Sequence, residues 1–97
     1  MTVSFTTTFR GDHSTAPEKA GKAAECWLRF GAVSAGGGMV FSGDHVGDST
    51  FTVVFANWES FGRGMELRRQ DAEFNALMAE ALAVATVSSR TVAVSFS

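Results

Sequence analysis

The sequence of 97 residues contains no tyrosine, one cysteine, one proline and two histidines. Without tyrosine, acid–base chemistry by a phenolic side chain is excluded. The single cysteine, Cys26, excludes an internal disulfide and leaves no cysteine cluster for a metal ion. No neighbouring base can be assigned to it, so we expect a small buried apolar residue. His13 and His45 remain as the candidate proton carriers.

Charge and long apolar runs are also scarce. Charged residues make up 19% of the chain, the formal net charge is −2, and the eight basic residues are scattered. A basic surface of the kind that binds nucleic acid is therefore not expected. No apolar run has the length of a transmembrane helix or of a signal peptide. We expect a cytoplasmic protein with no nucleic-acid or membrane partner.

Large apolar side chains are abundant by comparison. Apolar residue types make up 45% of the chain and include nine Phe and two Trp. Residues 1–97 suffice for a single domain with one core. A domain of this size leaves part of its apolar surface poorly covered, and association with a second copy is a common remedy.

The N-terminal part of the chain predicts a strand followed by a helix. Residues 3–10 alternate apolar and polar side chains, as in a strand with one buried face. Thr15 and Glu18 have the spacing of a capping box, which predicts a helix that runs to about Phe30. Gly31 is suited to end that helix.

A hairpin is predicted next. We interpret residues 36–38, three glycines, as a flexible lid or as the lead into the hairpin. Residues 39–46 and 49–56 have the composition of strands. Gly47-Asp48 suits a two-residue turn between them.

This register assigns side chains to the two faces of the hairpin. His45 lies on the face of Phe41 and Val54, and Asp44 lies on the opposite face with Phe55. Since neighbouring strand residues point to opposite faces, Asp44 and His45 do not form a catalytic pair. Large apolar groups occur on both faces, which indicates burial on both sides.

The remaining elements are two helices and a strand. Asn57 is placed to cap a helix from Trp58 to about Arg69, and Asp71 to cap a second one. Residues 84–96, rich in Val and Thr, predict the final strand.

The order of these elements predicts an α+β fold. It is the ferredoxin-like βαββαβ arrangement, with a four-stranded antiparallel sheet and the helices on one face. Because we expect the other face of the sheet to be apolar, we predict that a second copy covers it. The result would be a sheet-to-sheet homodimeric barrel.

Residues 55–78 carry the most specific pattern. A strand ends in an apolar run, Asn-Trp-x-Ser follows, an aromatic residue lies three positions after the Trp, and a short helix contains Glu-Phe-x-x-Leu. This pattern resembles the dimeric α/β-barrel superfamily, nearest to its antibiotic-biosynthesis-monooxygenase-like branch. The positions that carry the resemblance are Phe55, Trp58, Ser60, Phe61, Glu73, Phe74 and Leu77.

The resemblance implies a homodimer that binds a small apolar or aromatic metabolite between the sheet and the helices of each subunit. Members of the superfamily include cofactor-independent monooxygenases, cyclases, isomerases and haem-degrading enzymes. Arg68 stands where that pattern often has His, and residues 3–10 lack the Asn of oxygenase-type members. We therefore expect no haem and no other cofactor. The protein is either an enzyme of the cofactor-independent kinds or a non-catalytic ligand-binding or oligomerisation module.

Arg68 is the leading catalytic candidate. It continues an apolar helical stripe of Trp58, Phe61 and Met65. In a pocket, its guanidinium could hold an anionic substrate or stabilise developing negative charge. Alternatively, it extends from the helix end to solvent or pairs with a nearby Glu.

The other candidates have structural alternatives too. His13 lies in the loop after the first strand, at the expected pocket rim, and His45 could line the dimer interior; either could be a surface residue. Aromatic stripes at helical spacing are usually core, and Arg90 could be an exposed sheet-edge feature. The candidate ligand-binding residues are Trp27, Phe41, Phe55, Trp58, Phe61, Met65 and Arg90. No metal site is predicted.

Overall fold

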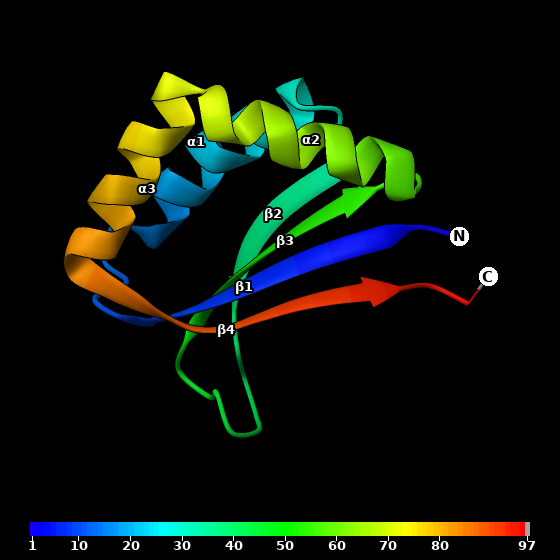
Figure 1. Cartoon of the computed structure of the whole chain (residues 1–97). Helices are drawn as coiled ribbons and strands as arrows, with labels where there is room; N and C mark the ends of the chain where they lie inside the picture. Colours follow the sequence, from blue (N-terminus) through cyan, green and yellow to red (C-terminus); the bar gives the residue numbers. More distant parts are fainter. Residues whose placement is uncertain (97) are drawn as a thin grey trace.

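The structure is a computed structural model that describes residues 1–96. Its sheet and helices form two layers (Figure 1). In chain order the elements are β1 (Val3–Gly11), α1 (Ala16–Arg29), β2 (Ser34–Met39), β3 (Ser49–Phe55), α2 (Trp58–Gln70), α3 (Ala72–Val84) and β4 (Ala85–Val94).

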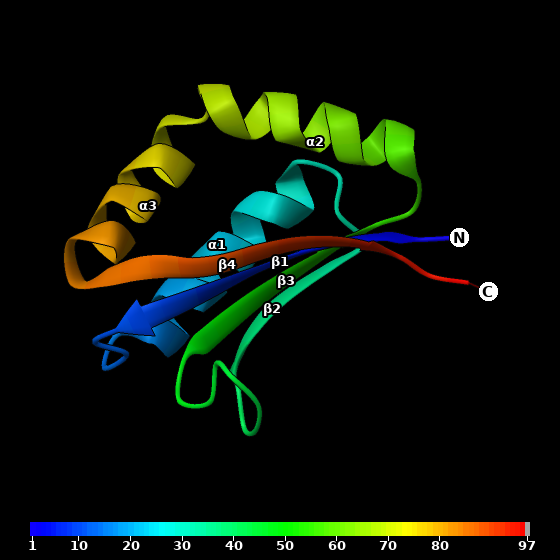
Figure 2. The ribbon, with the colours of Figure 1, turned by 60° about the horizontal axis from the view of Figure 1, so that its bottom comes forward.

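The four strands form one antiparallel sheet in the order β2-β3-β1-β4. All three helices lie on the same face of that sheet (Figure 2). This is the βαββαβ arrangement of a ferredoxin-like fold, with the second helical segment divided into α2 and α3. The predicted fold class is confirmed.

The alternation of β1 determines what each face of the sheet presents. Val3, Phe5 and Phe9 point toward the helices, where Val3 is completely buried. Thr7 also points inward, between two phenylalanines, although it is polar. The intervening residues of β1 point away from the helices. The helix-facing side is therefore mainly apolar, with one hydroxyl at its centre.

The core is built around Trp27 of α1. Its ring contacts Phe30, Phe55 and Phe74 edge-to-face, at centroid distances of 5.6, 6.0 and 5.4 Å. Each such pair adds roughly 0.5–1.5 kcal/mol beyond the burial of its area. Cys26 beside it is completely buried, as predicted. These contacts hold α1 and α3 against β3.

The helix boundaries follow from local capping. The Asn57 carboxamide oxygen accepts from the Ser60 N–H at 2.8 Å, and the Asp71 carboxylate accepts from the Phe74 N–H at 2.7 Å. Both predicted caps are confirmed. The predicted Thr15 capping box is wrong, because the Thr15 side chain caps no backbone N–H and instead accepts from Lys19.

The predicted position of the second strand is also wrong. Residues 34–39 form β2, so the three glycines are strand residues and neither a lid nor a lead-in. Gly37 lies under α1, and a Cβ there would be 2.9 Å from the Ala20 Cβ. Glycine thus permits the close approach of helix and strand. The apolar run that follows, whose composition favours a strand, lies in a loop instead.

Residues 40–48 consequently form a loop rather than a strand and a two-residue turn. Met39 pairs with Ser49, so the predicted pairing of residues 39–46 with residues 49–56 around a Gly47-Asp48 turn is wrong. The predicted faces of His45 and Asp44 are therefore wrong. Phe41 is 96% exposed in the loop, which projects beyond the sheet (Figures 1 and 2).

The corrected register changes the outer face of the sheet. Thr6 and Thr52 are cross-strand partners there, with their hydroxyl oxygens 3.0 Å apart. Other residues of this face are Ser4, Thr8, Thr50, Val54, Thr91 and Ala93. The expectation of an apolar outer face is wrong, because alternate residues of β1 and β3 are hydroxyl-bearing.

Asp48 fixes the loop to the outer face. Its side chain is 5% exposed and accepts hydrogen bonds from Arg10 Nε at 3.1 Å and Ser88 Oγ at 3.0 Å. His45 Nδ1 lies 3.4 Å from the same carboxylate. The hydrogen bond from Arg10 keeps the pKa of Asp48 below its ordinary value, with help from Ser88 and against the effect of burial. This cluster ties the loop to β1 and β4.

Candidate functional site

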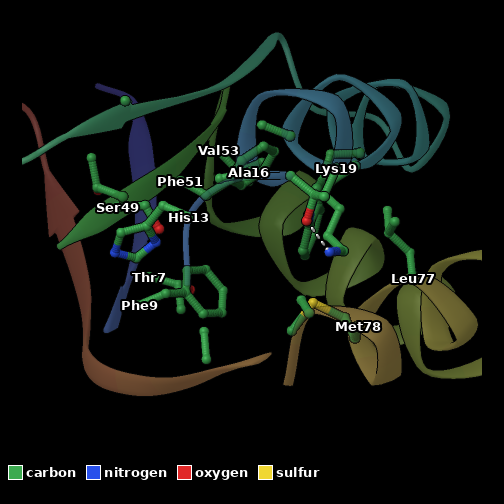
Figure 3. Close-up of a pocket in the computed structure, with 18 of the residues that line it drawn as sticks. Thr7, Phe9, His13, Ala16, Lys19, Ser49, Phe51, Val53, Leu77 and Met78 are labelled. Carbon is green, nitrogen blue, oxygen red and sulfur yellow. Dashed lines mark hydrogen bonds between the residues drawn. The ribbon is translucent and has the colours of Figure 1, made fainter. Parts of the chain in front are cut away.

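A cavity of about 120 Å³ lies between the sheet and helices α1 and α3. This volume resembles that of a cavity of roughly 150 Å³ that accepts benzene in another protein. Small residues of α1, Ala16, Ala20 and Ala23, leave the space open on one side. Phe9 and Phe51 of the sheet form part of the opposite wall (Figure 3). The cavity therefore has the size and apolar walls for one aromatic ring.

Arg68, at the C-terminal end of α2, lines this cavity. Its Nε is buried without a hydrogen-bond partner, and the guanidinium has no ion pair within residues 1–96. Burial lowers the pKa of Arg68, and the positive charges of Arg90 and Arg69 lower it further. Since the half-buried guanidinium has no counter-charge and its buried Nε–H lacks an acceptor, the site favours an anion beside it. The predicted pairing of Arg68 with a nearby Glu does not occur.

Arg90 lines the cavity from β4. It stands opposite Thr7 in the pairing of β1 with β4, so its side chain leaves the sheet on the helical side. The residue is exposed to solvent and also forms part of the cavity wall. It has no ion-pair partner among the described residues 1–96. Two arginines without counter-charges thus share one cavity.

Of the other predicted site residues, Trp27 and His13 also line the cavity. The His13 ring points into the same space as the Phe9 ring in Figure 3. Lys19 lines it from α1 and Asp12 from the loop after β1. The Asp12 carboxylate accepts from the Ser14 N–H at 2.9 Å, and this hydrogen bond lowers the pKa of Asp12. Asp12 is thereby engaged within its own loop.

The remaining predicted residues lie elsewhere. Phe55, Phe61 and Met65 belong to the core or pack against it, and Trp58 is 50% exposed. Phe41, on the projecting loop, does not line the cavity. The stripe on α2 therefore serves packing, except at Arg68.

His45 is separated from the cavity as well. It lies in the loop of residues 40–48, and not on a face of a strand, with its Nδ1 3.4 Å from the Asp48 carboxylate. The role proposed for it depended on the strand register that the structure corrects. His13 is then the histidine that lines the cavity.

Thr7 and Ser49 are two polar residues among the cavity-lining residues that the sequence did not indicate as site residues. Each is 9% exposed, and both line the space from the sheet. The alternation of residues 3–10 already placed Thr7 on the inward face between Phe5 and Phe9. Ser49 could not be found in this way, because its inward orientation depends on the register of β3 against β1.

Within residues 1–96, no group of three or more His, Cys, Asp or Glu side chains could hold a metal ion. No helix in that part of the chain is long and apolar enough to cross a bilayer.

The fold is shared with several solved proteins. SnoaB, a cofactor-independent oxygenase from Streptomyces nogalater, is 15% identical with a TM-score of 0.70, and the match covers 99% of this chain and 94% of SnoaB. A NIPSNAP domain protein from Burkholderia xenovorans is 15% identical with a TM-score of 0.69, over 98% and 94% of the two chains. A proposed antibiotic biosynthesis monooxygenase from Chloroflexus aurantiacus is 10% identical with a TM-score of 0.66, over 100% and 95%.

No family model matches the sequence, and no curated protein does. At these identities the structural matches establish the fold. The fold implied by the resemblance in residues 55–78 is therefore confirmed: the chain shares the ferredoxin-like α+β fold of these solved structures.

Proposed function

We propose that this protein binds a small, largely apolar aromatic metabolite with an anionic oxygen in the cavity between its sheet and helices. The observation that carries the proposal is the buried Arg68 Nε, which has no partner within residues 1–96. An oxyanion beside it would supply the missing hydrogen bond and neutralise the charge. Carboxylate, phenolate and enolate oxygens all meet this requirement.

The same arrangement suits cofactor-independent chemistry on the bound molecule. Negative charge that develops on a phenol or an activated carbonyl would be stabilised by Arg68 and Arg90, which are already in place. His13, on the wall of the same cavity, would move the proton. The likeness in fold to SnoaB, a cofactor-independent oxygenase, supports oxidation, cyclisation or isomerisation as the reaction class.

The second candidate is a ligand-binding module without catalysis. It is favoured because few groups could assist proton transfer. His13 has no carboxylate hydrogen-bonded to it within residues 1–96. A histidine without an orienting partner is a weak general base. Binding of an aromatic anion is common to both candidates.

Calorimetric titration with benzoate and benzamide tests the binding proposal. The two probes have nearly the same shape, but only benzoate carries a charge. We expect benzoate to bind the wild-type protein at least about tenfold more tightly, which corresponds to one charge-assisted hydrogen bond. The Arg68→Met variant should lose this preference. Equal binding of the two probes by the wild-type protein would overturn the proposal.

Arg69→Met is the matched control. Arg69 is adjacent to Arg68, exposed, and 3.4 Å from Glu66. Its replacement removes the same charge and leaves the cavity unchanged, so the preference for benzoate should persist. Loss of the preference in both variants would mean that net charge, and not Arg68, sets the affinity.

We also propose that the protein is a homodimer, on a revised argument. The outer face of the sheet is rich in Ser and Thr, so its apolarity no longer supports the idea. The support comes from Phe41 and Phe96, which have essentially no cover in the single chain. Native mass spectrometry of protein from its own cells should report twice the chain mass, together with any retained acidic ligand. A monomer mass at micromolar concentration would contradict the proposal.

A further inference from the structure

The inner face of the sheet carries two polar positions in an apolar surround. Thr7 and Ser49 are each 9% exposed, and their side chains line the cavity. Among residues 1–96 neither hydroxyl has a side-chain hydrogen bond. Arg68 Nε is the buried side-chain polar atom without a partner in residues 1–96, so these two hydroxyl oxygens are accessible from the cavity and each can contact a ligand oxygen there.

These two hydroxyls lie in different rows of the sheet, where a row is a set of residues paired with each other across neighbouring strands. Thr7 is opposite Arg90 on one side and Phe51 on the other. Ser49 is opposite Phe9, which lies two residues beyond Thr7 along β1. Two residues of a strand span roughly 7 Å. The cavity therefore has two polar rows separated by about the length of one substituted aromatic ring.

The two rows differ in charge. The row of Thr7 contains Arg90, and Arg68 lies close enough for the charge of Arg90 to affect it. The row of Ser49 has no cation among its paired strand residues, and His13 lies on the same side of the cavity in Figure 3. The first row is built for a carboxylate, and the second for a neutral hydroxyl or carbonyl oxygen.

Each of the two rows also contains a phenylalanine, Phe51 beside Thr7 and Phe9 beside Ser49. Phe9 and Phe51 occupy the sheet positions that alternate with the two hydroxyls. Met78 and Ala81 face them from α3. An aromatic ring fits between these surfaces, whereas a second charged group would be desolvated there.

We infer that the ligand is a single-ring aromatic carboxylic acid with an oxygen at the para position. Its carboxylate contacts Arg68, Arg90 and Thr7, and its para hydroxyl or carbonyl contacts Ser49 and His13. This inference rests on the proposed function, because it uses the same cavity and the same arginine. It adds the second contact, the distance between the two contacts and the ligand class.

Titration of the wild-type protein with four probes tests the inference without any variant. The probes are benzoate and its 2-, 3- and 4-hydroxy derivatives. We expect 4-hydroxybenzoate to bind about tenfold more tightly than 2-hydroxybenzoate, since only the para hydroxyl reaches Ser49. Affinities that are equal, that favour the 2- or 3-isomer, or that are too weak to detect would overturn the inference.

Ser49→Ala locates the second contact. In this variant the preference for 4-hydroxybenzoate over benzoate should fall at least about threefold from its wild-type value, because only His13 remains as a partner for the para oxygen. Ser34→Ala is the control, since Ser34 is an exposed strand residue on the outer face. A para preference that is unchanged in Ser49→Ala would contradict the assignment of Ser49.

The two proposals fail in different ways. If benzoate still binds more tightly than benzamide through Arg68, but the hydroxybenzoate isomers are indistinguishable, the proposed function stands and the ligand class falls. If benzoate and benzamide bind equally, both fall. If Arg68→Met loses the preference for benzoate over benzamide and Ser49→Ala reduces the preference for the para isomer, both proposals are supported.

Discussion

Arg68 of α2 and Arg90 of β4 line one cavity, and neither guanidinium has an ion-pair partner within residues 1–96. Two like charges near each other in an apolar space repel, and burial removes the water that would screen them. An arrangement of this kind is stable at little cost only with an anion between the charges or with continued access to solvent. Arg90 retains that access, whereas the Arg68 Nε does not.

Gly64 of α2 is the position where the helix touches the core most closely. A Cβ there would be 2.6 Å from Phe55 Cε1, and Phe55 is completely buried. We expect Gly64→Ala to lower the free energy of unfolding by about 1–3 kcal/mol, measured by urea denaturation. Gly62→Ala is the control in the same helix, where a Cβ meets nothing within 4 Å. It should stabilise the protein by up to about 1 kcal/mol. A Gly62→Ala variant less stable than Gly64→Ala would show that α2 does not pack against Phe55 as described.

The helix caps provide a second comparison. Asn57→Ala removes the acceptor for the Ser60 N–H and should cost about 1 kcal/mol of unfolding free energy. Thr15→Ala should cost much less, because the Thr15 side chain caps no backbone N–H. Thermal denaturation of the two variants measures the difference. A larger loss of stability for Thr15→Ala than for Asn57→Ala would support the capping box predicted from the sequence.

The Asp48 cluster predicts a dependence of stability on pH. The pKa of Asp48 is lowered in the folded protein, chiefly by the hydrogen bond from Arg10, so this carboxylate stabilises the fold above its unfolded pKa of about 3.9. That contribution disappears as the pH falls through the lowered folded value. Asp48→Asn should therefore reduce the urea midpoint at pH 7 and differ less from the wild-type protein near about pH 3.

Asp44→Asn is the matched control for that measurement, since Asp44 is exposed in the same loop. It should leave the midpoint almost unchanged at both pH values. A deficit for Asp48→Asn that grew on acidification would contradict the assigned ion pair.

Cys26 should be nearly unreactive in the native protein. Its side chain is completely buried, its thiol lies 3.3 Å from Glu73 Oε1, and burial raises its pKa. The thiolate is the reactive form, so both burial and the raised pKa slow the reaction. Ellman's reagent should modify the thiol slowly in buffer and rapidly in urea. Equal rates in the two conditions would show that the Cys26 thiol is not buried in the native protein.

The local signals in the sequence were sufficient for much of the fold. Asn57 and Asp71 each have an acceptor side chain and an N–H three residues later, and such caps need no information from elsewhere. The position of β2 required more. Gly37 pairs with Phe51 of β3 and lies close under Ala20 of α1, and both contacts join parts of the chain that no local pattern connects.

The site was predictable to a similar degree. Arg68 was identified because it interrupts an apolar stripe, which is a local signal. Ser49 and the exclusion of His45 both depend on the pairing of β3, and an error of register moves every side chain of a strand to the other face. The sequence could therefore indicate Arg68 as a cation of the cavity but could not indicate the Ser49 hydroxyl.

The most direct test follows the Nε–H signal of Arg68 in the ¹H–¹⁵N spectrum of arginine side chains. Assignment comes from the Arg68→Met variant, in which that signal is absent. On addition of benzoate the Arg68 signal should shift with saturation, while the signals of the exposed Arg63 and Arg69 stay in place, and benzamide should cause no comparable shift. A saturable shift confined to Arg63 or Arg69, or an Arg68 signal unmoved by benzoate, would contradict the claim that the cavity binds an aromatic anion through Arg68.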